Sequence, residues 1–246
     1  MKPILEVVNL TMKFGELIAN NNISFKVNEG EIVGLIGPNG AGKTTLFNCI
    51  TGYYRPFSGK VYFLGEDITG FPPYEIAKRG AVRTFQIVKP LKELSVLSNV
   101  MIGAFLREPD SNRARVIAED VLNFCGMLDL KDKPAGSLTI SDKKKLELAR
   151  ALATRPRLLL LDEVMAGLTS TEVKEAVRLI LKIRDMGITL LVVEHIMEAI
   201  MPIADRVVVL DGGEKIAEDV PEKVVNDEKV IKAYLGEKYH ARYKRS

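Results

Sequence analysis

Short apolar runs separated by glycine and asparagine dominate the first third of the chain, and they predict β-strands. The runs cover residues 4–8, 23–27, 31–36 and 60–64. One helix is predicted among them, opening at Lys43, because the apolar residues that follow have helical spacing. This part of the chain is therefore expected to be mostly β-structure.

From about residue 91 to residue 155 the apolar positions follow helical periods, and no run is convincing as a strand. The periods predict helices at 96–106, 113–127 and 142–154. We expect a single domain over residues 1–246 with an inserted helical subdomain at 87–156. Its core and β subdomain are then formed by the flanking parts, residues 1–86 and 157–246.

After Pro156 strands and helices alternate. Strands are predicted at 158–161, 188–193 and 206–210, and helices at 171–186 and from Ile196. Thr169 and Glu172 have the spacing of a capping box at the start of the longer helix, and Gly187 lies beyond its end. These strands show little polar alternation, so both of their faces should be buried. The pattern predicts an α/β fold with a mostly parallel sheet covered by helices.

The clearest chemical signal follows the strand at 31–36, where the chain matches the phosphate-binding pattern G-x-x-x-x-G-K-[ST] at every position. Its residues are Gly37, Pro38, Asn39, Gly40, Ala41, Gly42, Lys43, Thr44 and Thr45. Glycines let the backbone amides turn toward a phosphate, and the following helix adds the positive end of its dipole. We expect Lys43 to reach the β and γ phosphates of a nucleoside triphosphate, and Thr44 to bind Mg²⁺. A glycine-rich turn without a ligand is the alternative.

A second signal is the apolar strand at 158–161, which ends in Asp162 and Glu163. Carboxyl ends of parallel strands face the ligand crevice, where an aspartate can help to hold Mg²⁺. Adjacent strand residues point to opposite faces, so the two acids cannot share one role. We therefore expect Asp162 to serve the metal and Glu163 to orient water. A strand that merely ends in exposed acids is the alternative.

Composition narrows the class of protein. Hydrophobic residues make up 47% of the chain, enough to fill a buried core. The net charge of +3 gives no sign of a basic surface that would bind nucleic acid. Cys49 and Cys125 have neither disulfide nor zinc spacing, which fits a reducing compartment. No stretch approaches the roughly 18 apolar residues that span a bilayer, so we expect a protein that is neither secreted nor membrane-spanning. The basic end at 238–245 could lie near an anionic membrane, but a solvated tail is favoured.

In order and spacing, these residues resemble the ATP-binding cassette (ABC) ATPases over nearly the whole chain. The resemblance implies a P-loop NTPase fold with a mostly parallel core sheet, an antiparallel β subdomain and an inserted helical subdomain. It implies ATP and Mg²⁺ as ligands, with Glu163 as general base or water-orienting group. It also implies that Phe14 stacks on adenine, that Gln86 contacts Mg²⁺ and the attacking water, and that His195 contacts the γ phosphate.

One segment departs from that family. Where its signature has Leu-Ser-Gly-Gly-Gln, this chain has Leu138-Thr139-Ile140-Ser141-Asp142. In the family this segment contacts the nucleotide of the opposite subunit, which places Thr139 and Ser141 there. Asp142 adds a negative charge that Lys143 or Lys144 would have to compensate. Either the composite site is weakened and a mixed dimer hydrolyses asymmetrically, or the substitution is tolerated.

Further segments, at 82–86, 166–169, 192–198 and 231–236, resemble the ATPase subunits of branched-chain amino-acid importers. That resemblance implies transmembrane permease partners, a second cassette (a paralogue or a second copy) and, indirectly, a solute-binding protein. The chain is then peripheral to the cytoplasmic face of the inner membrane, and the helical block docks on the permease. The alternatives are another transporter, for urea, amides or lipids, a cassette ATPase acting on nucleic acid or ribosomes, and a triphosphate-dependent interaction module without hydrolysis.

Overall fold

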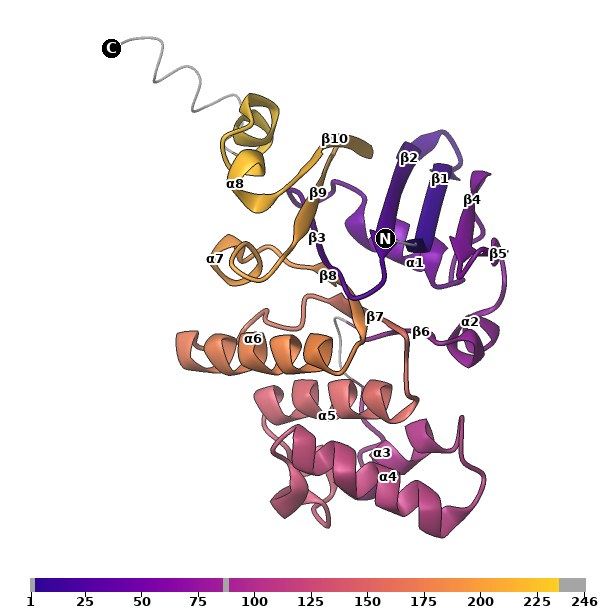
Figure 1. Ribbon diagram of the computed structural model, residues 1–246, viewed down its shortest axis with the longest axis vertical. Coiled ribbons are helices and arrows are strands. Elements are labelled where there is room, and N and C mark those ends of the chain that lie inside the picture. Colours follow the sequence, from indigo (N-terminus) through magenta and orange to yellow (C-terminus); the bar gives the residue numbers. More distant parts are fainter. Residues whose placement is uncertain (1–2, 86–88, 235–246) are drawn as a thin grey trace.

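The computed structural model describes residues 3–85 and 89–234. Its centre is a six-stranded sheet with the order β10-β9-β3-β8-β7-β6 (Figure 1). All neighbouring strands in it pair parallel except the edge pair β10 and β9. The strands are β3 (Ile32–Ile36), β6 (Ala81–Arg83), β7 (Leu158–Asp162), β8 (Thr189–Val193), β9 (Arg206–Asp211) and β10 (Glu214–Asp219).

Both faces of this sheet are buried. Every residue of β3, β7 and β8 is buried, and alternate residues enter different cores. Leu159 and Leu161 pack into the core on the helical side, whereas Leu158 and Leu160 pack into the core on the other side. The expectation of a mostly parallel sheet with two covered faces is thus confirmed.

The second sheet is antiparallel and has the order β2-β1-β4-β5. Its strands are β1 (Pro3–Phe14), β2 (Leu17–Asn28), β4 (Ser58–Phe63) and β5 (Glu66–Asp67). Its core is shared with helix α1 (Lys43–Ile50), through Leu46 and Phe47, and with one face of the large sheet. This sheet contains the antiparallel β-structure that the family resemblance implied.

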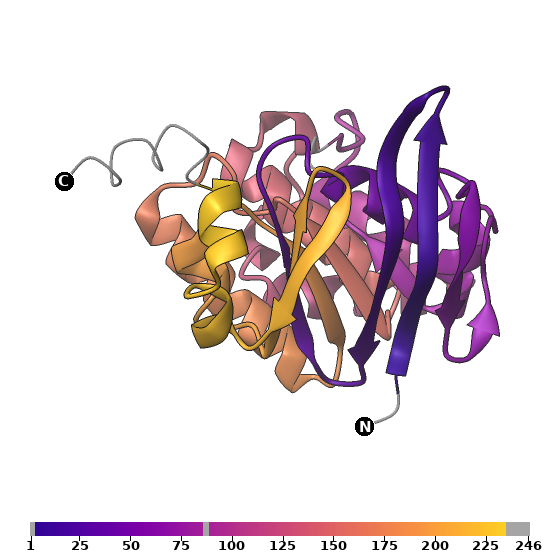
Figure 2. The ribbon, with the colours of Figure 1, turned by 90° about the horizontal axis from the view of Figure 1, so that it is seen from above.

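Strands β1 and β2 are 12 residues each, longer than the short strands we predicted (Figure 2). The asparagines at 20–22 precede the strand predicted at 23–27 and separate it from the apolar run before it, yet β2 runs through them. Register shifts against β1 accommodate them, and Asn22 adopts a left-handed φ of 51°. A polar tripeptide is therefore no barrier to a strand where a bulge takes up the extra residue.

Three helices form the block that is predicted as the helical subdomain, and they lie together at the lower end of Figure 1. They are α3 (Val96–Ala104), α4 (Ser111–Phe124) and α5 (Ile140–Ala153), with short 3₁₀ turns at Leu128–Leu130 and Ala135–Ser137. Their buried residues belong to the same core as the helical face of the large sheet. Helix α5 is thereby placed next to the strand ends of the core.

Helix α6 (Ser170–Asp185) begins with the predicted capping box between Thr169 and Glu172. The helix predicted from Ile196 is only one turn, α7 (Met197–Ile200), because Pro202 stops its continuation. Helices α2 (Pro73–Arg79) and α8 (Pro221–Val224) were not predicted. In α2 only Ile76 is buried, so it has no apolar period to detect. No helix within 3–85 and 89–234 is long and apolar enough to cross a membrane.

Candidate functional site

The loop between β3 and α1 depends on glycines at both ends. A Cβ on Gly37 would lie 2.1 Å from the Leu210 carbonyl oxygen, and Gly42 has φ +94° with the Ala19 carbonyl oxygen 2.5 Å from the place of a Cβ. No other residue fits either position. The loop is therefore held between β9 and β2, with its amides at the start of α1.

Lys43 opens α1 and is buried. Its ammonium donates hydrogen bonds to the carbonyl oxygens of Gly37 (2.6 Å) and Pro38 (2.9 Å). Burial lowers the pKa of Lys43, and the negative charges of Glu163 and Asp162 oppose that shift. A desolvated ammonium of this kind gains most from an anion that approaches the loop.

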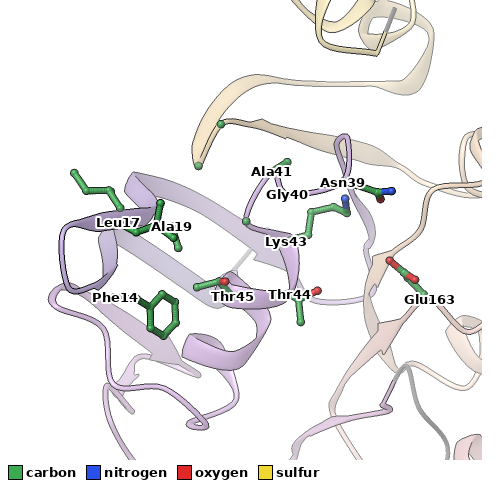
Figure 3. Close-up of a pocket in the computed structure, with 14 residues that line it drawn as sticks. Phe14, Leu17, Ala19, Asn39, Gly40, Ala41, Lys43, Thr44, Thr45 and Glu163 are labelled. Atoms are coloured by element: carbon green, nitrogen blue, oxygen red, sulfur yellow. The ribbon is translucent and has the colours of Figure 1, made fainter. Parts of the chain in front are cut away.

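A cleft of about 590 Å³ opens beside the loop. Figure 3 shows Phe14, Lys43, Thr44 and Glu163 around it. The predicted residues that line the cleft are Phe14, Asn39, Gly40, Ala41, Gly42, Lys43, Thr44, Thr45 and Glu163. Gly37 and Pro38 instead contribute the carbonyl groups that hold Lys43.

Five lining residues were not predicted: Leu17, Ile18, Ala19, Gly212 and Gly213. The first three lie at the start of β2, and the glycines lie in the turn between β9 and β10. No motif marks them in the sequence, because only the folded chain brings both segments to the loop.

Phe14 is half exposed at the end of β1. Its ring meets Tyr54 edge to face, with centroids 5.3 Å apart. A partly exposed ring at the rim of a cleft can stack on a flat base. This position is compatible with the adenine contact that the family implies, which stays a prediction.

Asp162 and Glu163 occupy different surroundings. Asp162 ends β7, and its side chain is 1% exposed, with Oδ2 accepting a hydrogen bond from Arg83 (2.7 Å). Burial raises the pKa of Asp162, and the Arg83 charge opposes the shift. Glu163 lines the cleft with φ +50°, and its amide donates to the Val193 carbonyl oxygen at 2.9 Å. The Glu163 carboxyl therefore faces the cleft beside the loop, whereas Asp162 lines a different hollow, next to Thr44 and Arg83.

The donor set fits Mg²⁺. Asp162 Oδ1 is buried and has no hydrogen-bond partner within the ranges that the structure describes. Asp162 also shares a hollow with Thr44, whose hydroxyl is a second hard oxygen. Gln86, the third predicted ligand, lies outside the described residues. Carboxylate and hydroxyl oxygens, completed by phosphate and water, are the ligands that Mg²⁺ prefers.

Arg83 is a site residue that sequence reasoning missed. The Arg83 side chain is only 7% exposed. Its guanidinium carbon lies over the rings of Phe85, 4.7 Å from the centroid, and Tyr53, 5.5 Å from the centroid. It also donates to Asn48 Oδ1 at 2.6 Å. Arg83 ends the short edge strand β6 and lies within the segment 82–86 that resembles the importer ATPases, but no motif gave it a role at the site.

His195 follows β8 and lies near Glu163. Its Nδ1 is 3.9 Å from Glu163 Oε2, and its side chain is 48% exposed. The preceding residue, Glu194, is fully buried, and its Oε1 accepts a hydrogen bond from the Met165 amide at 2.7 Å. Burial raises the pKa of Glu194 to about 7. The His195 side chain is thus partly exposed beside Glu163, and its contact with a γ phosphate stays a prediction.

Thr139 is the N-cap of α5. Its hydroxyl accepts from the Asp142 amide (3.1 Å) and donates to Asp142 Oδ2 (2.7 Å). Ser141 lines a different, smaller hollow against α6 rather than the cleft at the loop. Lys144 does not bond Asp142, because its ammonium reaches the carbonyl oxygens of Glu163 and Ala166 instead. The Asp142 carboxylate instead accepts a hydrogen bond from the Thr139 hydroxyl.

The sequence pattern of the ABC transporter family matches residues 20–166, and one for branched-chain amino acid ATP-binding cassette transporters matches residues 214–240. The chain belongs to the ATPases of ABC transporters. It is 40% identical to the high-affinity branched-chain amino acid transport ATP-binding protein BraF of Pseudomonas aeruginosa, over 96% of this chain and 99% of that protein. The resemblance inferred from the motifs is confirmed.

Solved structures agree. An ATP-binding cassette of an ABC transporter in its ADP conformation has a TM-score of 0.88 and 34% identity, covering 96% of this chain and 100% of that one. A dimeric cassette in a post-hydrolysis state, bound to ADP and Pi, has a TM-score of 0.80 and 25% identity, covering 88% and 98%. The predicted fold class is confirmed.

Proposed function

We propose that this chain binds and hydrolyses ATP as the energy-supplying subunit of a membrane transporter that imports branched-chain amino acids. One observation carries the chemistry: the loop with Lys43 and the carboxyl of Glu163 line the same cleft. The cargo rests on the similarity to BraF and on the family pattern matched at 214–240. Transport of urea, amides or lipids is the alternative within the same class.

The loop and α1 bind the phosphates. Backbone amides at 37–42 and the positive end of α1 attract the anion, and Lys43 exchanges its carbonyl partners for phosphate oxygens. Phe14 receives the adenine. Thr44 and Asp162, with Gln86, would hold Mg²⁺, which would supply positive charge beside the phosphates.

Glu163 and His195 act on the γ phosphate. The Glu163 carboxylate orients the attacking water and takes its proton, because it projects into the cleft from the end of β7. His195, 3.9 Å from that carboxylate, donates a hydrogen bond to the phosphate. Lys43 stabilises the charge that develops as the bond to the β phosphate breaks.

The proposed role of ATP binding and hydrolysis is to move the partner subunits. ATP binding closes this chain against a second cassette, a paralogue or a second copy, and hydrolysis reopens the pair. The segment 87–156 docks on transmembrane permease subunits, and the Gln86 region acts as hinge. A solute-binding protein delivers the transported amino acid to the permease. With these proposed contacts, the chain lies peripherally at the cytoplasmic face of the inner membrane.

The test uses the transporter assembled with its permease in lipid vesicles. Glu163→Gln should retain Mg-ATP binding and lower kcat by about 10²–10⁴-fold, since the water-orienting group is lost. Lys43→Ala should lower Mg-ATP affinity at least about tenfold, because a charged hydrogen-bond donor to phosphate is removed. Lys60→Ala, which breaks an exposed pair with Asp67, is the matched control and should change neither.

Two results would contradict the proposal at different levels. Unchanged hydrolysis in Glu163→Gln would exclude the assigned chemistry. ATP-driven uptake of urea but not of leucine would leave the chemistry intact and replace the cargo.

A further inference from the structure

Three consecutive lysines occupy the first turns of α5, at positions 143–145. Two of them have different surroundings. Lys145 forms an ion pair with Glu175 on α6 at 3.2 Å, with the Glu175 side chain half exposed. Lys144 is directed toward the end of β7, where its ammonium donates to the carbonyl oxygens of Ala166 (2.5 Å) and Glu163 (3.1 Å).

The segment that Lys144 contacts carries Glu163, the proposed water-orienting residue, and has an unusual backbone. Glu163 has φ +50°, a left-handed conformation that costs free energy in any residue other than glycine. Such a conformation persists only where surrounding contacts compensate for that cost. The Glu163 amide is fixed by the Val193 carbonyl at 2.9 Å. Two side chains supply further restraints: Lys144 donates to the carbonyl groups, and Glu194 accepts from the Met165 amide. The direction of the Glu163 carboxyl therefore depends on groups outside its own strand.

The charge of Lys144 suits this place. Its ammonium lies among the carboxyls of Glu194, Glu163 and Glu147, which favour the charged form, while burial lowers its pKa. Glu147, one turn further along α5, accepts a hydrogen bond from the Phe85 amide at 2.6 Å. One helix of the predicted helical subdomain thus grips both the segment with Glu163 and the strand end beside Gln86.

We propose that Lys144 is a positioning residue that fixes the main chain of Glu163 from α5. The Glu163 carboxyl then faces the cleft only while α5 is packed against the 163–166 segment. The assignment rests on the proposed role of Glu163. It gives the helix that follows Thr139 a direct mechanical link to the water-orienting acid. A shift of α5 withdraws two hydrogen bonds from the 163–166 segment and releases its strained backbone.

The experiment compares Lys144→Met with Lys145→Met in the complete chain. Lys144→Met should lower kcat about tenfold or more while the KM for ATP and the affinity for Mg-ADP change by less than about twofold. Lys145→Met removes a neighbouring charge of the same kind and should keep kcat within about twofold. Lys144→Arg retains donors for both carbonyls and should recover most of the lost kcat.

A second measurement separates positioning from general damage. In the Glu163→Gln background, adding Lys144→Met should cause no further loss in single-turnover hydrolysis, because both changes act through one group. Equal effects of Lys144→Met and Lys145→Met, or additive losses with Glu163→Gln, would overturn the inference. If Lys144→Met does not fold, faster amide exchange at 163–166 in Lys144→Gln supports the proposal, and unchanged exchange overturns it. Full activity of Glu163→Gln itself would instead refute the proposed function.

Discussion

At the scale of single residues, buried carboxyl groups around the site are only partly satisfied by hydrogen bonds. Glu147, Asp162 and Glu194 each have one buried carboxyl oxygen without a hydrogen-bond partner among the described residues. Proteins seldom retain such groups unless they serve a function, because each one costs desolvation free energy. Asp162 ends β7, Glu147 lines the same hollow as Asp162, and Glu194 bonds the Met165 amide just beyond β7, so all three lie beside the residues of the proposed chemistry.

Arg83 provides the first prediction at this scale. Its pair with Asp162 is buried, with side-chain exposures of 7% and 1%, so losing the cation leaves an uncompensated anion. Arg83→Met should lower the free energy of unfolding by about 3–5 kcal/mol. Urea unfolding measures this, with Arg157→Met as control. The Arg157–Glu29 pair is exposed and should contribute no more than about 1 kcal/mol. Equal losses in the two variants would contradict the structural role of Arg83.

Glu194 provides a pH-dependent prediction. Burial raises its pKa from 4.5 to about 7 in the folded state, so folding favours the protonated form. The associated stability is present below about pH 4.5 and is lost as the pH rises through 7. Glu194→Gln keeps an acceptor for the Met165 amide without a charge. The variant should be more stable than the natural chain at pH 8.5, by up to about 3 kcal/mol, and no more stable near pH 4.5.

Urea unfolding at the two pH values measures the difference. A stability gain that is the same at both would show that Glu194 does not titrate between them. A loss at high pH would show that a cation compensates the ionised carboxylate; the positive charge of Lys144 already opposes the rise in the Glu194 pKa.

At the scale of elements, local signals were sufficient where the chemistry is local. The phosphate loop, the capping box of α6 and the apolar strand ending in Asp162 could all be predicted, because each is complete within about ten residues. The turns that bring Ala19 and Gly213 to the cleft could not, since their role arises only when distant segments meet. The same holds for Lys144, which no pattern distinguishes from Lys145.

At the scale of the whole molecule, the altered signature matters only in a dimer of cassettes. The start of α5 presents the Ile140 side chain, 69% exposed, and an Asp142 carboxyl that is bonded to Thr139. A glycine-rich segment would bring its backbone close to a partner's phosphate, whereas a side chain and an anion oppose that approach. In a mixed dimer the site that uses this signature should therefore hydrolyse more slowly than the site built on this chain's own loop.

Placing Glu163→Gln in this chain alone removes the faster site, because that site combines its own Lys43 and Glu163 with the partner's signature. Most of the ATPase rate of the mixed dimer should then be lost. The equivalent change in the partner removes only the slower site and should leave most of the rate. Steady-state phosphate release from the two singly altered dimers decides the matter. Equal losses would mean that the departure at 138–142 is tolerated, and that both composite sites work alike despite the missing glycines.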